Sequence, residues 1–305
     1  MVRAGALLLG AAGEAWLAAL PDLAAELAAA WDLELGEPMT GGTAAVVLAA
    51  RTAEGREAVL KLPPPLADPT HSEARTLIAG HGRGYVELLA HDPANGAMLL
   101  ERLGPQLFEL GLPLDDQLVA ISETLRLAWT ASPAGEPFMD GGAKAQSLGA
   151  IIEAEWETLG RPCARRTVDV ALAFAAERGA AFDPDKAVLA HGDAHAWNTL
   201  LSPGPGPRPY KLVDPDGVFI EPAYDLAIPM REWAADLLAG DPAERGLARC
   251  RRLAALTGVA PGPIWRWGLV ERVSTGLLNV KAGFEGAEGF LTVADAWALA
   301  EPPPL

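Results

Sequence analysis

Apolar side chains recur every three or four residues from Gly13 to Trp31, a spacing typical of an amphipathic helix, with a kink expected at Pro21. Short apolar stretches separated by Gly- and Asn-containing turns follow, and they predict strands. One helical segment, Ser72 to Ala79, interrupts them. The five predicted strands are Leu33 to Leu35, Ala45 to Leu48, Glu57 to Leu62, Tyr85 to Leu89, and Ala97 to Glu101. The first hundred residues are therefore expected to form a small antiparallel sheet with one inserted helix, against which the leading helix packs.

Long helical patterns replace the strands after Arg102. Two short apolar runs, Ala187 to Ala190 and Tyr210 to Val213, are separated by HGDAHAWNTLL and a Pro- and Gly-rich loop. Four further helical segments are expected from there to the C-terminus. The earlier helices are predicted at Asp115 to Thr130, Lys144 to Leu159, and Val168 to Arg178. This change in pattern divides the chain into an N-terminal part, residues 1–101, and a mainly helical part, residues 102–305.

The formal net charge of −16 changes the picture of possible partners. Binding along a phosphate backbone needs clustered Lys and Arg, so nucleic acid is not an expected partner. An acidic field attracts cationic small molecules, although the same charge also serves solubility. Glu14 and Pro21 interrupt the first apolar run before it reaches membrane-spanning length, so no membrane partner is expected.

Cys163 and Cys250 lack metal-type spacing and could form at most one bridge, which fits a reducing cytoplasm. Nothing in the sequence requires a second subunit, and a monomer is favoured.

The densest polar cluster lies between two apolar runs, in the loop His191 to Asn198. Asp214 follows the next apolar run. Phosphoryl transfer needs an oriented acceptor hydroxyl and cations that offset the charge on the phosphate oxygens. Asp193 could orient the hydroxyl, while Asn198 and Asp214 supply the oxygen ligands that Mg²⁺ prefers. The order of these three residues therefore indicates a kinase that uses ATP and Mg²⁺.

The N-terminal part contains matching candidates for nucleotide binding. Lys61 ends a predicted strand and Glu73 follows on the next helix, the pairing by which kinases fix a lysine on the nucleotide phosphates. The turn that contains Gly41, Gly42 and Thr43 could cover the phosphates with backbone N–H groups, but a Gly-Gly turn taken alone is more typical of an ordinary hairpin. Neither a P-loop nor a dinucleotide-binding glycine motif is present.

Together these motifs resemble the aminoglycoside phosphotransferase family, and within it the streptomycin 6-kinase group of aminoglycoside/hydroxyurea antibiotic resistance kinases. The loop HGDAHAWN, followed by VDPDG and EPAYDLA, is similar to the family's catalytic loop, metal-binding aspartate and structural aspartate. The resemblance extends to GEAWLAALPDL, TGGTAAVV, AVLKL, MLLERL and the helix from Trp265 to Lys281. It implies an α+β, two-lobed protein-kinase-like fold, with a five-stranded antiparallel N-lobe and a larger helical C-lobe.

The resemblance also implies roles for individual residues. Asp193 would be the catalytic base or hydroxyl-orienting residue, Asn198 and Asp214 the Mg²⁺ ligands, and Lys61 the phosphate contact with Glu73 as its partner. The backbone from Glu101 to Leu103 would bind adenine.

Five further residues are predicted to have supporting or substrate-binding roles. His191 is expected to hydrogen-bond the backbone near the catalytic loop, and Asp225 to brace that loop by accepting its N–H groups. Trp197, Glu221 and Trp233 are the predicted substrate contacts, although most Trp residues of the chain could simply belong to the core.

The leading hypothesis is an ATP-dependent kinase that phosphorylates a hydroxyl of an aminoglycoside-like, cationic substrate such as streptomycin. A kinase for another sugar or amino-sugar metabolite is the alternative within the same class. Two alternatives come from other classes: a metallohydrolase using His191, Asp193 and His195 as ligands, and a non-catalytic nucleotide-binding protein.

Overall fold

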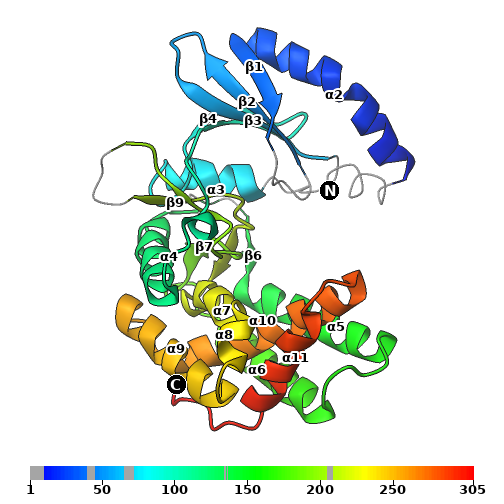
Figure 1. The fold of residues 1–305 in the computed structure, drawn as a ribbon, viewed down its shortest axis with the longest axis vertical. Coiled ribbons are helices and arrows are strands. Elements are labelled where there is room, and N and C mark those ends of the chain that lie inside the picture. Colours follow the sequence, from blue (N-terminus) through cyan, green and yellow to red (C-terminus); the bar gives the residue numbers. More distant parts are fainter. Residues whose placement is uncertain (1–9, 40–44, 65–71, 134, 136, 205–208) are drawn as a thin grey trace.

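The N-terminal part of the chain forms a five-stranded antiparallel sheet with the strand order β1-β2-β3-β5-β4. The sheet lies at the top of Figure 1, next to α2. The computed structural model describes residues 10–39, 45–64, 72–133, 135, 137–204 and 209–305. The strands are β1 (Leu33–Pro38), β2 (Val46–Thr52), β3 (Glu57–Leu62), β4 (Leu88–Asp92) and β5 (Ala97–Glu101). The predicted small antiparallel sheet is therefore confirmed.

One helix covers each face of this sheet. On β5, side chains alternate between the two faces, as the period of two requires. Leu99 packs in a small core with Leu27 of α2 (Ala11–Ala30), whereas Met98 belongs to the larger core together with Leu77 of α3 (Ser72–Gly80). The leading helix therefore packs on the outer face, as the sequence predicts, and α3 lies between the sheet and the second lobe (Figure 1).

The fourth strand differs from the prediction, which began it at Tyr85. Residues 84–86 pair instead with β9 (Tyr210–Leu212) of the second lobe: Val86 N donates to Leu212 O (2.9 Å) and Leu212 N donates to Gly84 O (2.8 Å). Gly84 has φ +72° and lies so close to α4 (Leu114–Ala128) that an added Cβ would sit 2.6 Å from the Ala128 nitrogen. The backbone groups of residues 84–86 thus form their strand-like hydrogen bonds with the second lobe. A local sequence pattern cannot show this partner.

Helices dominate the second lobe, with α10 at its centre, in contact with α5, α6, α7, α9 and α11 (Figure 1). Five helices, α7 to α11, follow Val213 in the described residues, where the sequence predicted four segments. The short α8 is separated from α7 at Trp233, which has a positive φ of 52°. The helices not yet given are η1 (Leu107–Leu110), α5 (Gly141–Thr158), α6 (Arg165–Ala180), α7 (Ala223–Arg231), α8 (Ala234–Leu238), α9 (Pro242–Thr257), α10 (Pro261–Ala282) and α11 (Ala287–Trp297).

Two small sheets in the second lobe position the polar loops. Strands β6 (Met139–Asp140), β10 (Val218–Ile220) and β7 (Val188–Ala190) form one sheet, and β8 (Thr199–Leu201) pairs with β9 in the other. The loop 191–198 joins β7 to β8, and the loop 213–217 joins β9 to β10. Backbone bonds hold the loops together, from Asp216 N to His191 O (2.8 Å) and from Val213 N to Asn198 O (2.9 Å).

Both cysteines are free and buried. Burial raises the pKa of the Cys163 thiol to about 11 and that of Cys250 to about 12. Among the described helices, none combines the length and apolar composition that a membrane crossing requires.

Candidate active site

Asp225, on the first turn of α7, holds the loop 191–198 in place through hydrogen bonds from the loop backbone. Its side chain is fully buried, and Oδ1 accepts a hydrogen bond from Gly192 N (2.7 Å). Oδ2 accepts from His191 N (3.0 Å) and from Trp129 Nε1 (2.8 Å). Burial raises the pKa of Asp225, while the nearby imidazole of His191 and the three donors oppose that shift. The loop backbone is thereby tied to a helix of the buried core.

Backbone groups fix the tautomers of both loop histidines. Nδ1 of His191 accepts from Asp193 N (3.0 Å), so the proton of the neutral ring lies on Nε2, which donates to Val213 O (2.8 Å). Nδ1 of His195 likewise accepts from Asn198 N (3.2 Å). Its Nε2 faces Asp193 Oδ2 at 3.2 Å. Neither ring has a free lone pair for a metal, so the metallohydrolase alternative finds no support in this geometry.

Asp193 lies in the loop 191–198 and contacts a residue of that loop and one of α7. Oδ2 is within hydrogen-bond distance of His195, and Oδ1 is bound by the guanidinium of Arg231, the last residue of α7. Burial favours the neutral form, but the His195 hydrogen bond and the Arg231 charge outweigh it and hold the pKa of Asp193 well below its usual range. The carboxylate is therefore ionised and has acceptor capacity left for a ligand hydroxyl.

Lys61 joins the two lobes through carboxylates. Its Nζ lies 2.6 Å from Glu73 Oε1 on α3 and 2.8 Å from Asp214 Oδ1 beyond β9. The Lys61 side chain is 11% exposed, whereas that of Asp214 is 53% exposed. Burial alone lowers the pKa of Lys61, but the charges of Glu73 and Asp214 reverse the effect and raise it above its usual range. The predicted pair of Lys61 and Glu73 is therefore brought together, and Asp214 joins it.

Asn198 and Asp214 lie at the same end of the β8–β9 ribbon, because Thr199 pairs with Leu212. The Asn198 amide donates from Nδ2 to Asp193 O (3.1 Å), which leaves its Oδ1 without a hydrogen bond among the described residues. Asp214 has the uncommon φ of +57° for a residue with a side chain, and its Oδ2 is likewise unengaged within the described part of the chain. These two hard oxygens suit Mg²⁺, which takes one or two protein ligands and completes its shell with water and phosphate.

The backbone expected at adenine follows β5. The Glu101 side chain is engaged within the protein, since its Oε1 accepts from Glu87 N (2.8 Å) and forms an ion pair with Lys211. Gly104 N bonds to Leu201 O (2.7 Å). Between them, the N–H and C=O of Leu103 make no hydrogen bond to any described residue, so both can serve a planar base. Gly41, Gly42 and Thr43 lie outside the described residues.

The structure treats the three predicted substrate residues differently. Trp197 is 46% exposed and stacks on Phe108 with ring centroids 3.8 Å apart. Trp233 lies two residues beyond Arg231, and its ring contacts the Arg249 guanidinium. Glu221 has partners within the protein: both oxygens bind Arg178 at 2.8 Å, and Oε1 also accepts from Trp267 Nε1. This carboxylate fastens α6 to α10, and its predicted contact with substrate stays a prediction.

Sequence reasoning missed Arg231 and the residues that hold it, because their contacts join distant segments. The sequence did offer one signal for this network, a charged residue within an otherwise apolar helical segment. Arg231 ends the apolar stretch of α7, and Glu271 lies among buried apolar positions of α10. Isolated charges at such positions are expensive unless they are paired, so they point to a buried polar network.

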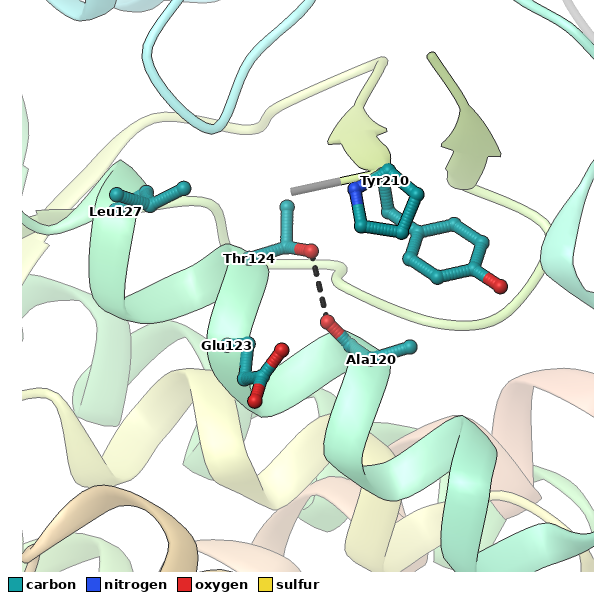
Figure 2. A pocket seen from close by; sticks show the side chains of 6 residues that line it. Ala120, Glu123, Thr124, Leu127 and Tyr210 are labelled. Atoms are coloured by element: carbon teal, nitrogen blue, oxygen red, sulfur yellow. Dashed lines mark hydrogen bonds between the residues drawn. The ribbon is translucent and has the colours of Figure 1, made fainter. Parts of the chain in front are cut away.

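A small pocket lies outside this constellation, between α4 and the start of β9 (Figure 2). Tyr210 borders it, at the end of β9 opposite to Asp214. Thr124 donates to Ala120 O (2.7 Å) inside α4, and Glu123 is the charged residue of the lining. Nothing in the pocket adds to the chemistry around Asp193.

Comparison with known proteins identifies the family. Residues 31–283 match the model of the aminoglycoside/hydroxyurea antibiotic resistance kinases. The chain belongs to that family. The streptomycin 6-kinase of Streptomyces glaucescens is 32% identical, over 71% of this chain and 68% of that protein. The hydroxyurea phosphotransferase of Kitasatospora aureofaciens is 31% identical, over 76% of this chain and 69% of that protein. The chain is accordingly a phosphotransferase with a hydroxyl group as acceptor.

Solved structures confirm the fold of this family member. Choline kinase LicA from Streptococcus pneumoniae superimposes with a TM-score of 0.61 at 14% identity, covering 92% of this chain and 99% of that one. The aminoglycoside phosphotransferase APH(3'')-Id from Streptomyces rimosus, in complex with ADP and streptomycin, gives a TM-score of 0.54 at 17% identity, covering 84% and 98%. At these identities the likeness concerns the α+β, two-lobed fold alone.

Proposed function

We propose that this phosphotransferase transfers the γ-phosphate of ATP, bound with Mg²⁺, to a hydroxyl of a cationic, aminoglycoside-like antibiotic, with streptomycin as the first acceptor to test. The observation that carries the proposal is the contact of Lys61 with both Glu73 and Asp214. It links the proposed phosphate-binding lysine of one lobe to the proposed metal-binding aspartate of the other. Asn198 connects this pair to Asp193, because its Nδ2 donates to Asp193 O and its own carbonyl accepts from Val213 N.

Binding of the nucleotide would use groups that the protein leaves available. Leu103 offers its N–H and C=O to adenine, and Lys61, held by Glu73, faces the phosphates. Asn198 Oδ1 and Asp214 would hold Mg²⁺, which when bound offsets charge on the transferring phosphoryl group. Asp214 would then exchange part of its contact with Lys61 for the metal.

The chemistry on the acceptor side rests with Asp193. Its carboxylate accepts the hydrogen bond of the acceptor hydroxyl and so aims the oxygen at the γ-phosphorus. A strongly basic carboxylate is not required, because in a loose phosphoryl-transfer transition state the hydroxyl proton leaves late. The low pKa of Asp193 therefore suits an orienting role.

The net charge of the chain supports a cationic acceptor. Close to Asp193 the charges balance, because Asp193, Glu232 and Glu271 bind Arg231 while Arg249 and Arg272 bind the adjoining backbone. The chain as a whole carries a formal net charge of −16. Its field would attract the ammonium or guanidinium groups of a substrate.

The test is a coupled ADP-release assay with Mg·ATP, with streptomycin, other aminoglycosides, amino sugars and hydroxyurea as separate acceptors. Mass spectrometry of the product should show one added phosphoryl group on streptomycin. Activity with hydroxyurea or an amino sugar instead would replace the acceptor class and keep the kinase. Absence of Mg·ATP binding would overturn the proposal as a whole.

A further inference from the structure

Arg231 is the one residue whose guanidinium reaches Asp193 among the described residues. Its Nη2 binds Asp193 Oδ1, its Nε lies 3.0 Å from Glu232 Oε1, and its Nη1 lies 3.0 Å from Glu271 Oε2. The Arg231 side chain is 11% exposed. All three nitrogens of the planar group are thus engaged at once, which fixes the plane in space.

The carboxylate partner of Arg231 on α10 is itself immobilised. Glu271 is 4% exposed in its side chain, and its Oε1 accepts a hydrogen bond from the hydroxyl of Tyr224. Tyr224 is fully buried and packs edge-on against Trp267. The orientation of Arg231 therefore depends on the rigid helical core and not on a mobile loop.

Two more arginines hold the backbone on which Arg231 lies. Arg272 Nη2 donates to Met230 O (2.8 Å) and to Arg231 O (2.6 Å), and Arg249 Nη1 donates to Glu232 O (2.7 Å). Cations suit this position because the C-terminal carbonyls of α7 carry partial negative charge. Arg272 forms no ion pair with any described carboxylate, and burial lowers its pKa to about 9. A buried guanidinium without a carboxylate partner is costly. We therefore expect that holding the C-terminal end of α7 in place serves the function of the protein.

We propose that Arg231 is a positioning residue, which rests on the proposed function: together with His195 it holds the carboxylate of Asp193 in one rotamer, with a lone pair directed at the acceptor hydroxyl. An ionised carboxylate has about four acceptor positions. Arg231 takes one on Oδ1 and His195 one on Oδ2, so each oxygen keeps a position for a ligand. Arg231 acts through Asp193 and contacts neither nucleotide nor metal.

The test compares Arg231→Met, Arg231→Lys and the wild type at saturating Mg·ATP and acceptor. Misplacing a reacting group by about 1 Å costs about 10²-fold in rate, so kcat should fall by about that factor in Arg231→Met. The Kd for Mg·ADP should stay within about twofold of the wild type, because no nucleotide contact is lost. Arg231→Lys should fall between, since an ammonium keeps the charge but not the planar fork.

A matched control and a double variant separate positioning from general structural support. Arg252→Met removes an exposed arginine that pairs with Asp115 and should leave kcat unchanged. In an Asp193→Ala background, Arg231→Met should cause no further loss of the residual rate, because residues that act as one unit are not additive. An additive loss, or a weakened Kd for Mg·ADP with unchanged kcat, would overturn the proposal.

A crystal structure of Arg231→Met gives a readout that needs no acceptor. Asp193 should occupy more than one rotamer in the variant and a single one in the wild type, and a single unchanged rotamer in the variant would overturn the proposal. If Arg231→Met does not fold, Arg231→Lys serves for the same comparison. If the wild type phosphorylates none of the tested acceptors, the proposed acceptor fails, and the rotamer of Asp193 still decides the role of Arg231.

Discussion

Two clusters of the site each hold one cation between carboxylates, but they are built differently. On the nucleotide side, the ammonium of Lys61 lies between Glu73 and Asp214, and Asp214 is half exposed. On the acceptor side, the guanidinium of Arg231 lies among Asp193, Glu232 and Glu271, and two further arginines fix the backbone beneath it. The first cluster has one solvent-facing partner, whereas the second is anchored in the core of the C-lobe.

From this difference in exposure and anchoring we infer which half of the site can rearrange. An ammonium is a compact charge on a flexible stem, so Lys61 can exchange a carboxylate for phosphate at little cost. A planar guanidinium bound on several sides cannot move without breaking several hydrogen bonds together. We therefore expect the nucleotide side to reorganise when ligand binds and the acceptor side to be preorganised.

On the acceptor side, Asp193→Ala should cause the largest loss of activity. Loss of the orienting carboxylate should reduce kcat by about 10²–10⁴-fold, the range typical of a positioned proton acceptor. The Kd for Mg·ADP, measured by calorimetry, should change little because the nucleotide side is intact. Asp185→Ala, at an exposed turn, is the matched control. Turnover close to that of the wild type would exclude Asp193 from the reaction.

Asp214→Ala tests the nucleotide side. Losing even an outer partner of a metal ligand commonly costs about 10–100-fold in metal affinity, and a direct ligand should cost at least as much. The affinity for ADP should therefore fall strongly in the presence of Mg²⁺ and little in the presence of EDTA. Calorimetry under both conditions provides the measurement. Equal Mg²⁺-dependent affinities in variant and wild type would remove Asp214 from the ligand set.

Asp225→Asn tests, through the free energy of unfolding, how strongly the loop 191–198 is tied to the buried core. An amide presents N–H groups on one side, so it cannot accept from both backbone donors and Trp129 as the carboxylate does. A buried donor left unpaired costs about 1–3 kcal/mol, and urea unfolding should show a loss of that size. Trp129→Phe, which removes one of the three donors and keeps the carboxylate, should lose less. Unchanged stability in Asp225→Asn would mean that the brace is not needed.

Gly217→Ala is expected to have the smallest effect on turnover, because it removes no side chain of the site. Gly217 has φ +69°, and an added Cβ would lie 2.3 Å from Thr76 Oγ1 of α3. The left-handed conformation alone costs about 1–2 kcal/mol, and the displaced helix should also raise the KM for Mg·ATP, because α3 carries Glu73. Gly160→Ala, with φ +73° and open space around the Cβ, isolates the conformational cost. An identical KM in both variants would argue against coupling between the 213–217 loop and α3.

Much of the site could be predicted because its parts follow from local patterns. Lys61 ends an alternating strand, and Asp193, Asn198 and Asp214 flank short apolar runs, so their order along the chain was sufficient to suggest phosphoryl transfer. Glu221 shows the limit of this approach. Its neighbourhood in sequence gave no sign that Arg178 and Trp267, 43 and 46 residues away, bind its carboxylate.

The α+β pattern, the approximate places of the five strands and the candidate residues for phosphate and metal could all be predicted from the sequence, because each depends on periodicity or spacing within a short segment. Only the tertiary structure decided that Arg231 holds Asp193, 38 residues away, that Lys61 reaches Asp214, 153 residues away, and that residues 84–86 pair with β9. The physical reason is that buried charges and open strand edges must find partners. Which partner each one finds depends on how the two lobes pack, and no local pattern records that packing.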